Sequence, residues 1–299
     1  MSYGIEEKTC IVTGATSGIG YETARILAAA GARIVGVGRD PARCASAEAR
    51  IQEETGSSRV RFLPADLSAQ AAVKGLAERI AAENARVDIL VNNAGIYASR
   101  HRESMDGVEL QFAVNYLCGF LLTRELLPLL EAAPASRVIN VSSGSHFAGR
   151  INWKDVGMRR GYFGLKAYDQ SKLALVLFTY ELARRLGSGS TISTYAVDPG
   201  LVKTDIASKG GGFIVKLVWR MRTRNGKSPR EAAESIAWLA ASPEASGRTG
   251  QYWKEGSPLA SSGASYSPED ARRLWQLSEK LCGMERWSSE RKIVSRSAT

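Results

Sequence analysis

The sequence predicts an α/β protein in which helices cover both faces of a doubly wound parallel sheet. Short β-branched runs alternate with longer runs rich in alanine and leucine along most of the chain. Several of the short runs are apolar at nearly every position, which is typical of strands that are buried on both faces. The alternation itself favours a parallel sheet over separate helical and β regions.

Each element is expected from its local composition. The β-branched runs predict strands at residues 9–12, 33–37, 60–63, 89–91, 137–141, 191–197 and 251–253. The segments with helical spacing of apolar residues predict helices at 19–30, 41–54, 69–83, 106–131, 165–186, 230–241 and 267–282.

The length of 299 residues fits one large domain or two small ones, at ~100–200 residues per domain. No internal repeat and no linker rich in proline and glycine divides the chain. We therefore expect one domain over residues 1–284. The serine- and charge-rich end, residues 285–299, is expected to form a mobile tail.

Composition narrows the chemistry. The two histidines, His101 and His146, are too few for a histidine-rich metal centre, and the four cysteines form no C-x-x-C pair. We therefore expect no metal site and no disulfide framework, and the free thiols indicate a reducing compartment. The sequence shows no signal peptide and no apolar run of ~20 residues, so we expect a cytoplasmic protein.

A glycine-rich turn follows the first expected strand and opens the first expected helix. The stretch TGATSGIG spans residues 13–20 and contains Gly14, Ser17, Gly18, Ile19 and Gly20. Glycines let the backbone turn tightly and approach a phosphate, and the helix N-terminus offers free N–H groups. An ordinary glycine-rich turn is the alternative, but the strand–turn–helix context favours a Rossmann-type dinucleotide site.

The residue after the second strand reads the adenosine ribose in such sites, where an acidic side chain would bind the 2′-hydroxyl. Here Gly38 is followed by Arg39, whose guanidinium can pair with a 2′-phosphate. This favours NADP(H) over NAD(H). The alternative is a solvated surface arginine that Asp40 partly neutralises.

Further motifs follow in order along the chain, and together with TGATSGIG they resemble the short-chain dehydrogenase/reductase family, most closely its retinol dehydrogenase-like branch. The branch is indicated by RVINVSS at 137–143, His146, SKLALVLFT at 171–179 and YAVDPG at 195–200. The family motifs are Asp66-Leu67, Asn92-Asn93-Ala94-Gly95, Asn115, Ser143, Tyr168-x-x-x-Lys172, and Pro199-Gly200 with Thr204.

The residue types suit carbonyl reduction or the reverse alcohol oxidation. Tyr168 is the expected acid/base. Lys172, one helical turn away, is expected to bind the ribose and, together with the charge of oxidised nicotinamide, to lower the pKa of the phenol. Ser143, at the end of a strand, is expected to bind the substrate oxygen beside Tyr168. The resemblance implies that Asn115 holds a water linking Lys172 to solvent.

Two of these residues have a competing neighbour in the sequence. Tyr162-x-x-x-Lys166 is a second copy of the tyrosine–lysine pattern, but flanking glycines give it a poor helical context. Ser142 competes with Ser143, and strand alternation sends the two side chains to opposite faces. Alignment to the family motif selects Ser143.

The resemblance also assigns cofactor contacts. Asp66 and Leu67 are expected to line the adenine pocket, although Asp66 could instead cap the next helix. The NNAG stretch is expected to run along the cofactor rather than form a simple turn. The remaining expected cofactor residues are Asn93, Ala94, Gly95, Pro199, Gly200, Val202 and Thr204.

The substrate is expected beyond the carboxyl ends of the strands. Residues 203–228 predict a partly apolar lid with a glycine hinge, and Phe147, Ile151, Trp153, Tyr162 and Phe163 occupy an insertion before Tyr168. Both features favour a bulky lipophilic carbonyl or alcohol, such as an isoprenoid aldehyde, a steroid or a polycyclic ketone. The alternative is that these aromatic residues only pack the loops.

The net charge of +10 is uneven, because residues 203–227 carry seven basic residues and one acidic residue. This basic lid predicts proximity to an anionic cofactor or substrate and, secondarily, contact with an anionic membrane surface. Nucleic acid is not expected as a partner, since no binding motif or aromatic platform accompanies the charge.

Family members often form dimers or tetramers, so the resemblance implies a homo-oligomer. The alternative to an oxidoreductase is a non-catalytic nucleotide sensor or scaffold protein of the same fold.

Overall fold

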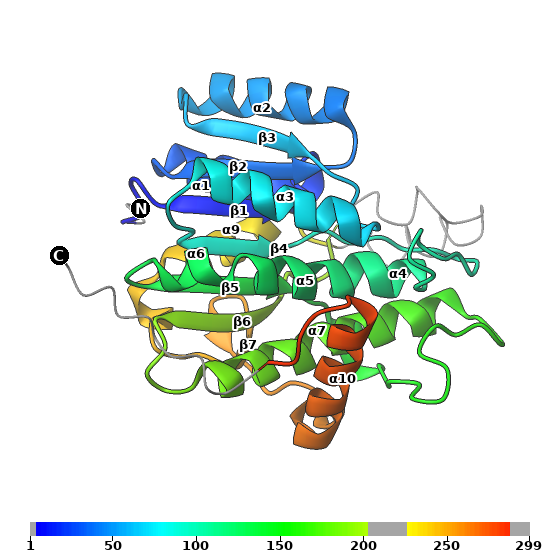
Figure 1. Cartoon of the computed structure of the whole chain (residues 1–299). Coiled ribbons are helices and arrows are strands. Elements are labelled where there is room, and N and C mark those ends of the chain that lie inside the picture. The colour runs from blue at the N-terminus through cyan, green and yellow to red at the C-terminus, as the bar shows by residue number, and fades with distance from the viewer. Residues whose placement is uncertain (1–3, 203–225, 288–299) are drawn as a thin grey trace.

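The computed structural model describes residues 4–202 and 226–287. Its strands form one sheet in the order β3-β2-β1-β4-β5-β6-β7-β8 (Figure 1). All neighbouring strands from β3 to β7 pair in parallel, and β8 pairs antiparallel with β7 at the edge. This confirms the predicted doubly wound α/β fold.

The strands lie where the β-branched runs predicted them; β1 and β4 are buried at every position, and β2, β5 and β6 at all positions but one. Their bounds are β1 Thr9–Thr13, β2 Arg33–Gly38, β3 Val60–Pro64, β4 Ile89–Asn92, β5 Ser136–Val141, β6 Ile192–Asp198, β7 Gln251–Lys254 and β8 Ser257–Pro258. The short hairpin to β8 was not predicted, since two exposed residues carry no strand pattern.

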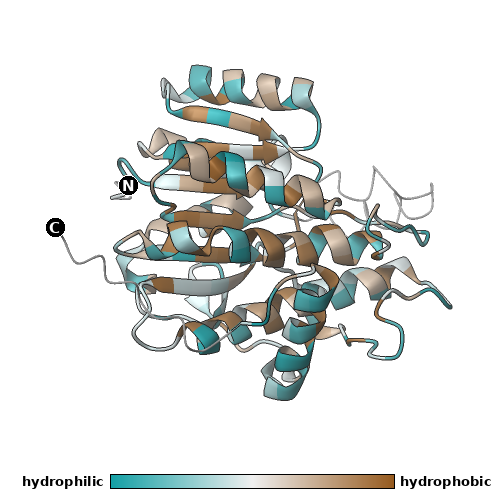
Figure 2. Ribbon diagram, viewed as in Figure 1, coloured by the Kyte–Doolittle hydropathy of each residue, from teal (hydrophilic) through white to brown (hydrophobic). Residues whose placement is uncertain are grey.

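Helices cover both faces of the sheet, and apolar residues fill the space between the layers (Figure 2). One layer contains α1 Gly18–Ala29, α2 Pro41–Thr55 and α9 Pro229–Ala241. The other contains α3 Gln70–Glu83, α5 Cys118–Glu125, α7 Gly164–Leu186 and α10 Pro268–Leu281. Two covered faces explain why the strands are apolar at consecutive positions.

The single helix expected over residues 106–131 is wrong. The structure divides the segment into α4 Leu110–Phe112, a π-helical turn η1 at Ala113–Leu117, α5, and α6 Leu127–Glu131. The first helical turn begins at Leu110 and not at residue 106, because the Glu109 carboxylate caps α4 and accepts from the N–H groups of Gln111 and Phe112. Pro128 lies in the first turn of α6, where its missing N–H costs nothing.

The long helix α7 is buried at every position from Ala167 to Leu182. Its inner face packs on the sheet, and α10 packs against it from outside (Figure 1). Trp275 of α10 is 1% exposed and lies edge-on to Phe120 and tilted against Phe178, in a shared aromatic cluster.

A buried ion pair anchors α10 beside this cluster. Arg124 Nη1 lies 2.7 Å from Glu279 Oε1, and both side chains are only 5% exposed. The same carboxylate oxygen accepts from the indole N–H of Trp275, and Tyr116 and Ser278 share a 2.6 Å hydrogen bond nearby. The outer cover of α7 is therefore fixed by polar as well as apolar contacts.

The strand order reverses between β1 and β4, because the chain runs outward through β2 and β3 and then returns to the other side of β1. In doubly wound sheets the ligand crevice lies at this switch point, outside the carboxyl ends of the strands. No helix within the described ranges is long and apolar enough to span a membrane.

Candidate active site

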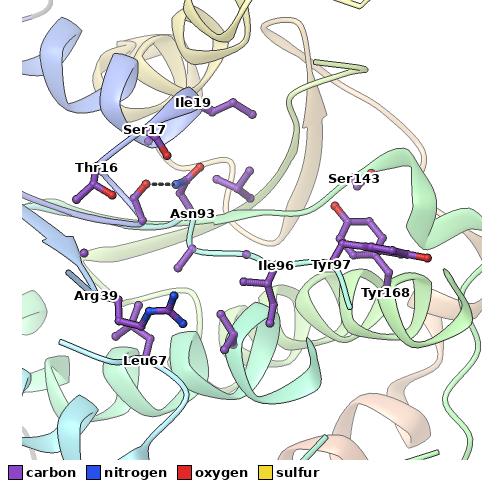
Figure 3. A pocket seen from close by; sticks show the side chains of 18 of the residues that line it. Thr16, Ser17, Ile19, Arg39, Leu67, Asn93, Ile96, Tyr97, Ser143 and Tyr168 are labelled. Atoms are coloured by element: carbon purple, nitrogen blue, oxygen red, sulfur yellow. Dashed lines mark hydrogen bonds between the residues drawn. The ribbon is translucent and has the colours of Figure 1, made fainter. Parts of the chain in front are cut away.

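A pocket of about 1050 Å³ opens at the carboxyl ends of the central strands. This is at the upper end of the range of about 300–1,000 Å³ that small-molecule and cofactor sites occupy. Every predicted catalytic and cofactor-binding residue within the described ranges lines it, except Asn115. Figure 3 shows Thr16, Ser17 and Arg39 at one end and Ser143, Tyr168 and Tyr97 at the other. Thr204 and most of the predicted lid lie outside the described residues.

The glycine-rich turn places a helix N-terminus on the pocket wall. Gly14 and Gly18 have φ values of +67° and +60°, which favour glycine over residues that carry a side chain. A Cβ on Gly20 would lie 2.4 Å from both Gly14 O and Asn93 Nδ2. Ser17 makes no side-chain capping bond to α1. The first turn of α1 thus offers uncapped N–H groups to the pocket, which suits the phosphates of a dinucleotide.

The NNAG stretch is braced against this turn. Thr13 Oγ1 accepts from the N–H groups of Asn93, at 2.9 Å, and Ala94, at 3.0 Å. The Asn93 amide in turn donates to Thr13 O at 2.8 Å, and Figure 3 shows it reaching toward the glycine-rich turn. The Asn93 side chain therefore holds the NNAG stretch against the glycine-rich turn.

Arg39 is exposed on the pocket wall. The carboxylate of Asp40 accepts from the Arg43 N–H at 2.9 Å and so caps α2; no ion pair within the described ranges joins it to Arg39. Arg43 also lines the pocket. Gly38 is required by packing, because a Cβ there would lie 2.3 Å from Thr16 Cγ2.

Asp66 and Leu67 both line the pocket. Asp66 is exposed and accepts from the N–H and the hydroxyl of Ser68, so it closes a local turn. It does not cap the next helix, since α3 begins at Gln70 and the Gln70 N–H donates to Asp106. Leu67 is 8% exposed and packs into the core beneath the pocket.

Ser143, Tyr168 and Lys172 meet where β5 ends above α7. A side-chain hydrogen bond joins the Tyr168 phenol to Ser143, and Lys172 Nζ lies 5.6 Å from the centre of the Tyr168 ring. Lys172 Nζ also donates to Val141 O at 3.0 Å. The Ser142 hydroxyl faces away and donates to Lys172 O at 2.9 Å. Both serines follow the end of β5 and line the pocket, but the Ser142 hydroxyl is used by Lys172 O, and Ser143 is the serine that bonds the Tyr168 phenol.

Burial dominates the electrostatics of this group. It raises the pKa of Tyr168, reinforced by the charges of Asp169 and Asp198 and opposed by the Ser143 hydrogen bond. It also lowers the pKa of Lys172 to about 8, with Asp198 the main opposing charge. The lowered phenol pKa expected from the sequence is therefore not a property of the protein surroundings alone. It requires a further positive charge beside Tyr168, such as oxidised nicotinamide.

Asn115 lies just behind the pocket wall, in the π-helical turn η1. Its side chain accepts from Ile96 N–H at 2.7 Å and donates to Ile96 O and to Ser171 Oγ. A Cβ on Gly95 would lie 3.5 Å from Asn115 Oδ1 and 3.7 Å from Lys172 Nζ. Asn115 thus joins the NNAG loop to the helix that carries Tyr168 and Lys172.

The competing tyrosine, Tyr162, belongs to a separate polar cluster. Its hydroxyl lies 3.0 Å from Glu109 Oε1 and 3.1 Å from Ala98 O, and it accepts from Gln111 Nε2 at 2.8 Å. Burial raises the pKa of Glu109. Tyr162 therefore ties the insertion before α7 to the loop after β4, and it does not line the pocket.

The other apolar residues of the insertion also lie outside the pocket lining. Ile151 and Trp153 pack against the core, and Phe147 and Phe163 are about half exposed. The alternative of loop packing thus fits them better than the predicted substrate-lining role. The structure instead provides an apolar pocket wall that the sequence reasoning missed, formed by Ile96, Tyr97, Leu110, Val114 and Leu201.

Tyr97 is the most prominent of these missed residues. Its ring lies 6.2 Å from that of Tyr168 in an edge-to-face arrangement. Its position two residues after the NNAG stretch is the signal that could have identified it. At the other end, Pro199, Gly200 and Val202 line the pocket as expected, and Gly200 donates its N–H to Asp198 Oδ1.

Comparisons with known proteins agree with this geometry. The short chain dehydrogenase family model matches residues 8–211. Retinol dehydrogenase 13 of Mus musculus is 40% identical over 290 residues, covering 94% of this chain and 85% of that protein. Polyprenol dehydrogenase of Mus musculus is 38% identical over 288 residues, covering 92% and 84%. The crystal structure of an uncharacterized protein from Mycobacterium Paratuberculosis has a TM-score of 0.76 at 31% identity, covering 95% of this chain and 98% of that one.

Proposed function

The chain belongs to the short-chain dehydrogenase/reductase family of oxidoreductases, and from that premise we propose that it transfers hydride between NADP(H) and a bulky lipophilic carbonyl or alcohol. The observation that carries the proposal is the meeting of Ser143, Tyr168 and Lys172 at one end of a pocket whose other end is a phosphate cradle. Two relatives, a retinol dehydrogenase and a polyprenol dehydrogenase, are named for isoprenoid alcohols. Their names support the proposed substrate class.

The described residues fit a nicotinamide dinucleotide. The uncapped first turn of α1 and the glycines at 14, 18 and 20 would hold the pyrophosphate, and Asp66 and Leu67 would flank the adenine. Arg39 and Arg43 would hold a 2′-phosphate. Bound NADPH supplies the hydride for the carbonyl carbon.

Proton transfer is then the task of the chain's own residues. In the direction of reduction, the Tyr168 hydroxyl gives its proton to the substrate oxygen as that oxygen gains negative charge, and Ser143 donates a hydrogen bond to the same oxygen. The phenolate that remains is stabilised by the Lys172 cation and takes a proton back from solvent. Asn115 keeps the NNAG loop and the helix of Lys172 in register. The apolar wall around Tyr97 excludes water and favours a lipophilic substrate.

The test is NADPH oxidation, followed by absorbance, with a panel of aldehydes and ketones that ranges from short aliphatic to isoprenoid and steroid carbonyls. We expect turnover that is faster, as kcat/KM, for the bulky apolar members. The alternative, a nucleotide sensor or scaffold without catalysis, would bind NADPH and turn over no member of the panel. Faster turnover of the short aliphatic members would refute the proposed substrate class.

The cofactor preference has its own test in Arg39→Ala. Because a charge-assisted hydrogen bond contributes about 1.5–3 kcal/mol, we expect kcat/KM for NADPH to fall about 10- to 100-fold while kcat/KM for NADH changes little. Arg33→Ala is the matched control, since Arg33 begins the same strand at its opposite end, is exposed and does not line the pocket. An equal loss with both cofactors would contradict the assignment of NADP(H).

A further inference from the structure

His146 is fully buried three residues after Ser143, in the single 3₁₀ turn Gly144–Phe147 that follows β5. The proposed reaction gives it no role, and it does not line the pocket. Its ring packs against two aromatic side chains, with centroids 4.2 Å from Phe147 and 4.6 Å from Tyr252. Burial lowers the pKa of this imidazole below its ordinary value, so the ring is neutral at pH 7.

The hydrogen bonds of the ring define which nitrogen carries the proton. Nε2 lies 3.1 Å from the backbone nitrogen of Ser262, which can only donate, so Nε2 must be the acceptor. Nδ1 lies 2.7 Å from Ser143 O, which can only accept, so Nδ1 must carry the hydrogen. Both ring nitrogens are therefore used, and only one neutral tautomer satisfies both partners.

The bond to Ser143 O acts on the residue whose hydroxyl faces Tyr168. The same carbonyl also accepts from the His146 N–H at 3.1 Å, and the Ser143 hydroxyl accepts from Ser145 N–H at 3.2 Å. The orientation of the Ser143 hydroxyl thus depends on the conformation of a turn that His146 closes from both its backbone and its ring.

The bond to Ser262 connects this turn to a distant segment, residues 261–266. That segment is internally bonded, since the Ser265 hydroxyl donates to Ser262 O and shares a 2.6 Å hydrogen bond with Ser261 Oγ. Ser261 is also held at 2.7 Å by the hydroxyl of Tyr180, which lies on α7. The turn after Ser143 is therefore fixed to a scaffold that is itself fixed to the helix of Tyr168.

We propose that His146 is a positioning residue for the reaction: in its Nδ1–H tautomer the ring donates to Ser143 O, closes the turn that carries Ser143 and so holds the Ser143 hydroxyl in place against Tyr168, while the Ser262 N–H fixes the ring in this tautomer. The proposal rests on the proposed function for its kinetic consequence. Its structural content, one tautomer with two named partners, can be tested without any turnover.

The tautomer is tested by ¹⁵N NMR of the histidine rings. The chain has only two histidines, so a His101→Gln variant assigns both sets of signals. We expect the His146 spectrum to show a protonated Nδ1 and an unprotonated Nε2 at pH 7. A protonated Nε2 would overturn the proposal, whether or not the protein turns over any carbonyl.

The kinetic test uses two replacements that separate the hydrogen bond to Ser143 O from the hydrogen bond to the Ser262 N–H. His146→Leu removes both hydrogen bonds, whereas His146→Asn places an amide N–H near the position of Nδ1 and can keep the bond to Ser143 O. Because a misplacement of about 1 Å can cost about 100-fold in rate, we expect His146→Leu to lower kcat about 10- to 100-fold with no change in the Kd of NADPH. His146→Asn should recover most of kcat without recovering the bond to Ser262.

Tyr180→Phe is the matched control, because it loosens residues 261–266 through Ser261 without touching Ser143. Hydrogen exchange should show loss of protection at residues 261–266 in Tyr180→Phe, and at both 143–148 and 261–266 in His146→Leu. Wild-type kcat in Tyr180→Phe together with rescue by His146→Asn supports the proposal. An Asn variant no faster than the Leu variant, or an unaltered exchange pattern at 143–148 in His146→Leu, refutes it. Absence of turnover in the unmodified protein would refute the proposed function, and the exchange pattern would still decide where His146 acts.

Discussion

Tyr168→Phe is expected to reduce kcat by about 10²–10⁴-fold, the usual contribution of a positioned general acid, and to leave the Kd of NADPH within about twofold. The ring and its packing against Tyr97 are kept, and only the hydroxyl that bonds Ser143 is lost. Steady-state turnover of the best carbonyl substrate, with a fluorescence titration of NADPH, measures both quantities.

Tyr162→Phe is the matched control, since the second tyrosine carries the same sequence pattern and lies in the Glu109 cluster. Removing its hydroxyl leaves the Gln111 amide and the buried Glu109 each short of one hydrogen bond. We expect a loss of about 1–3 kcal/mol in the free energy of unfolding, with kcat retained. Full activity in Tyr168→Phe, or abolished activity in Tyr162→Phe alone, would reverse the assignment.

Lys172→Met is expected to abolish most of the turnover while making the protein more stable at pH 7. Burial holds the pKa of Lys172 at about 8, below its ordinary 10.5, so keeping this lysine protonated at pH 7 costs the fold about 3 kcal/mol. The lost hydrogen bond to Val141 O offsets about 1 kcal/mol of the gain. We expect a net rise of about 2 kcal/mol in the free energy of unfolding, and a fall in kcat of about 100-fold or more.

The sign of the effect can be checked by pH. Because the folded pKa of Lys172 lies below the unfolded one, the unfolded chain binds more protons between about pH 8 and 10.5. The free energy of unfolding of the unmodified protein should therefore rise over this window relative to that of Lys172→Met, and by pH 10.5 the unmodified protein should be the more stable by about 1 kcal/mol, the contribution of the hydrogen bond to Val141 O. Denaturant titrations at several pH values measure it.

Lys166→Met removes a positive charge from the first turns of the same helix, but Lys166 is exposed. It should change neither stability nor turnover appreciably. A Lys172→Met protein that is less stable than the unmodified one at pH 7 would show that the cation contributes more through its contacts than burial costs.

The fold could be predicted from the sequence because its signals are local. The consecutive apolar residues within β1 and β4 each indicate a strand that is covered on both faces. The glycines of TGATSGIG indicate the turn between β1 and α1. The choice of Ser143 over Ser142 came from alignment to the family motif, and the structure joins Ser143 to the Tyr168 phenol and Ser142 to Lys172 O. These inferences need no knowledge of which segments meet in space.

The parts that could not be predicted depend on distant partners. Nothing in the sequence near Tyr162 indicates that its hydroxyl forms hydrogen bonds with Glu109 and Gln111, which lie about 50 residues earlier. The division of the expected 106–131 helix depends on Glu109 acting as a cap and on a π-helical turn that presents Asn115 to Ile96 and Ser171. The pKa of Tyr168 differs from expectation because burial by the complete fold outweighs what a lysine one turn away indicates.

The packing of α10 against α7 has a consequence for synthesis in the cell. Chains leave the ribosome N-terminus first, at about 5–20 residues per second, so β1 to β5 and the phosphate cradle can form before the helix of Tyr168 has its outer cover. That cover, with Trp275 and the Arg124–Glu279 pair, emerges only with residues 268–281. The nucleotide-binding half can thus mature early, whereas the helix that carries Tyr168 and Lys172 gains its outer cover only after residues 268–281 have emerged. A nascent chain stalled before residue 268 would leave the apolar outer face of α7 open to chaperones and proteases.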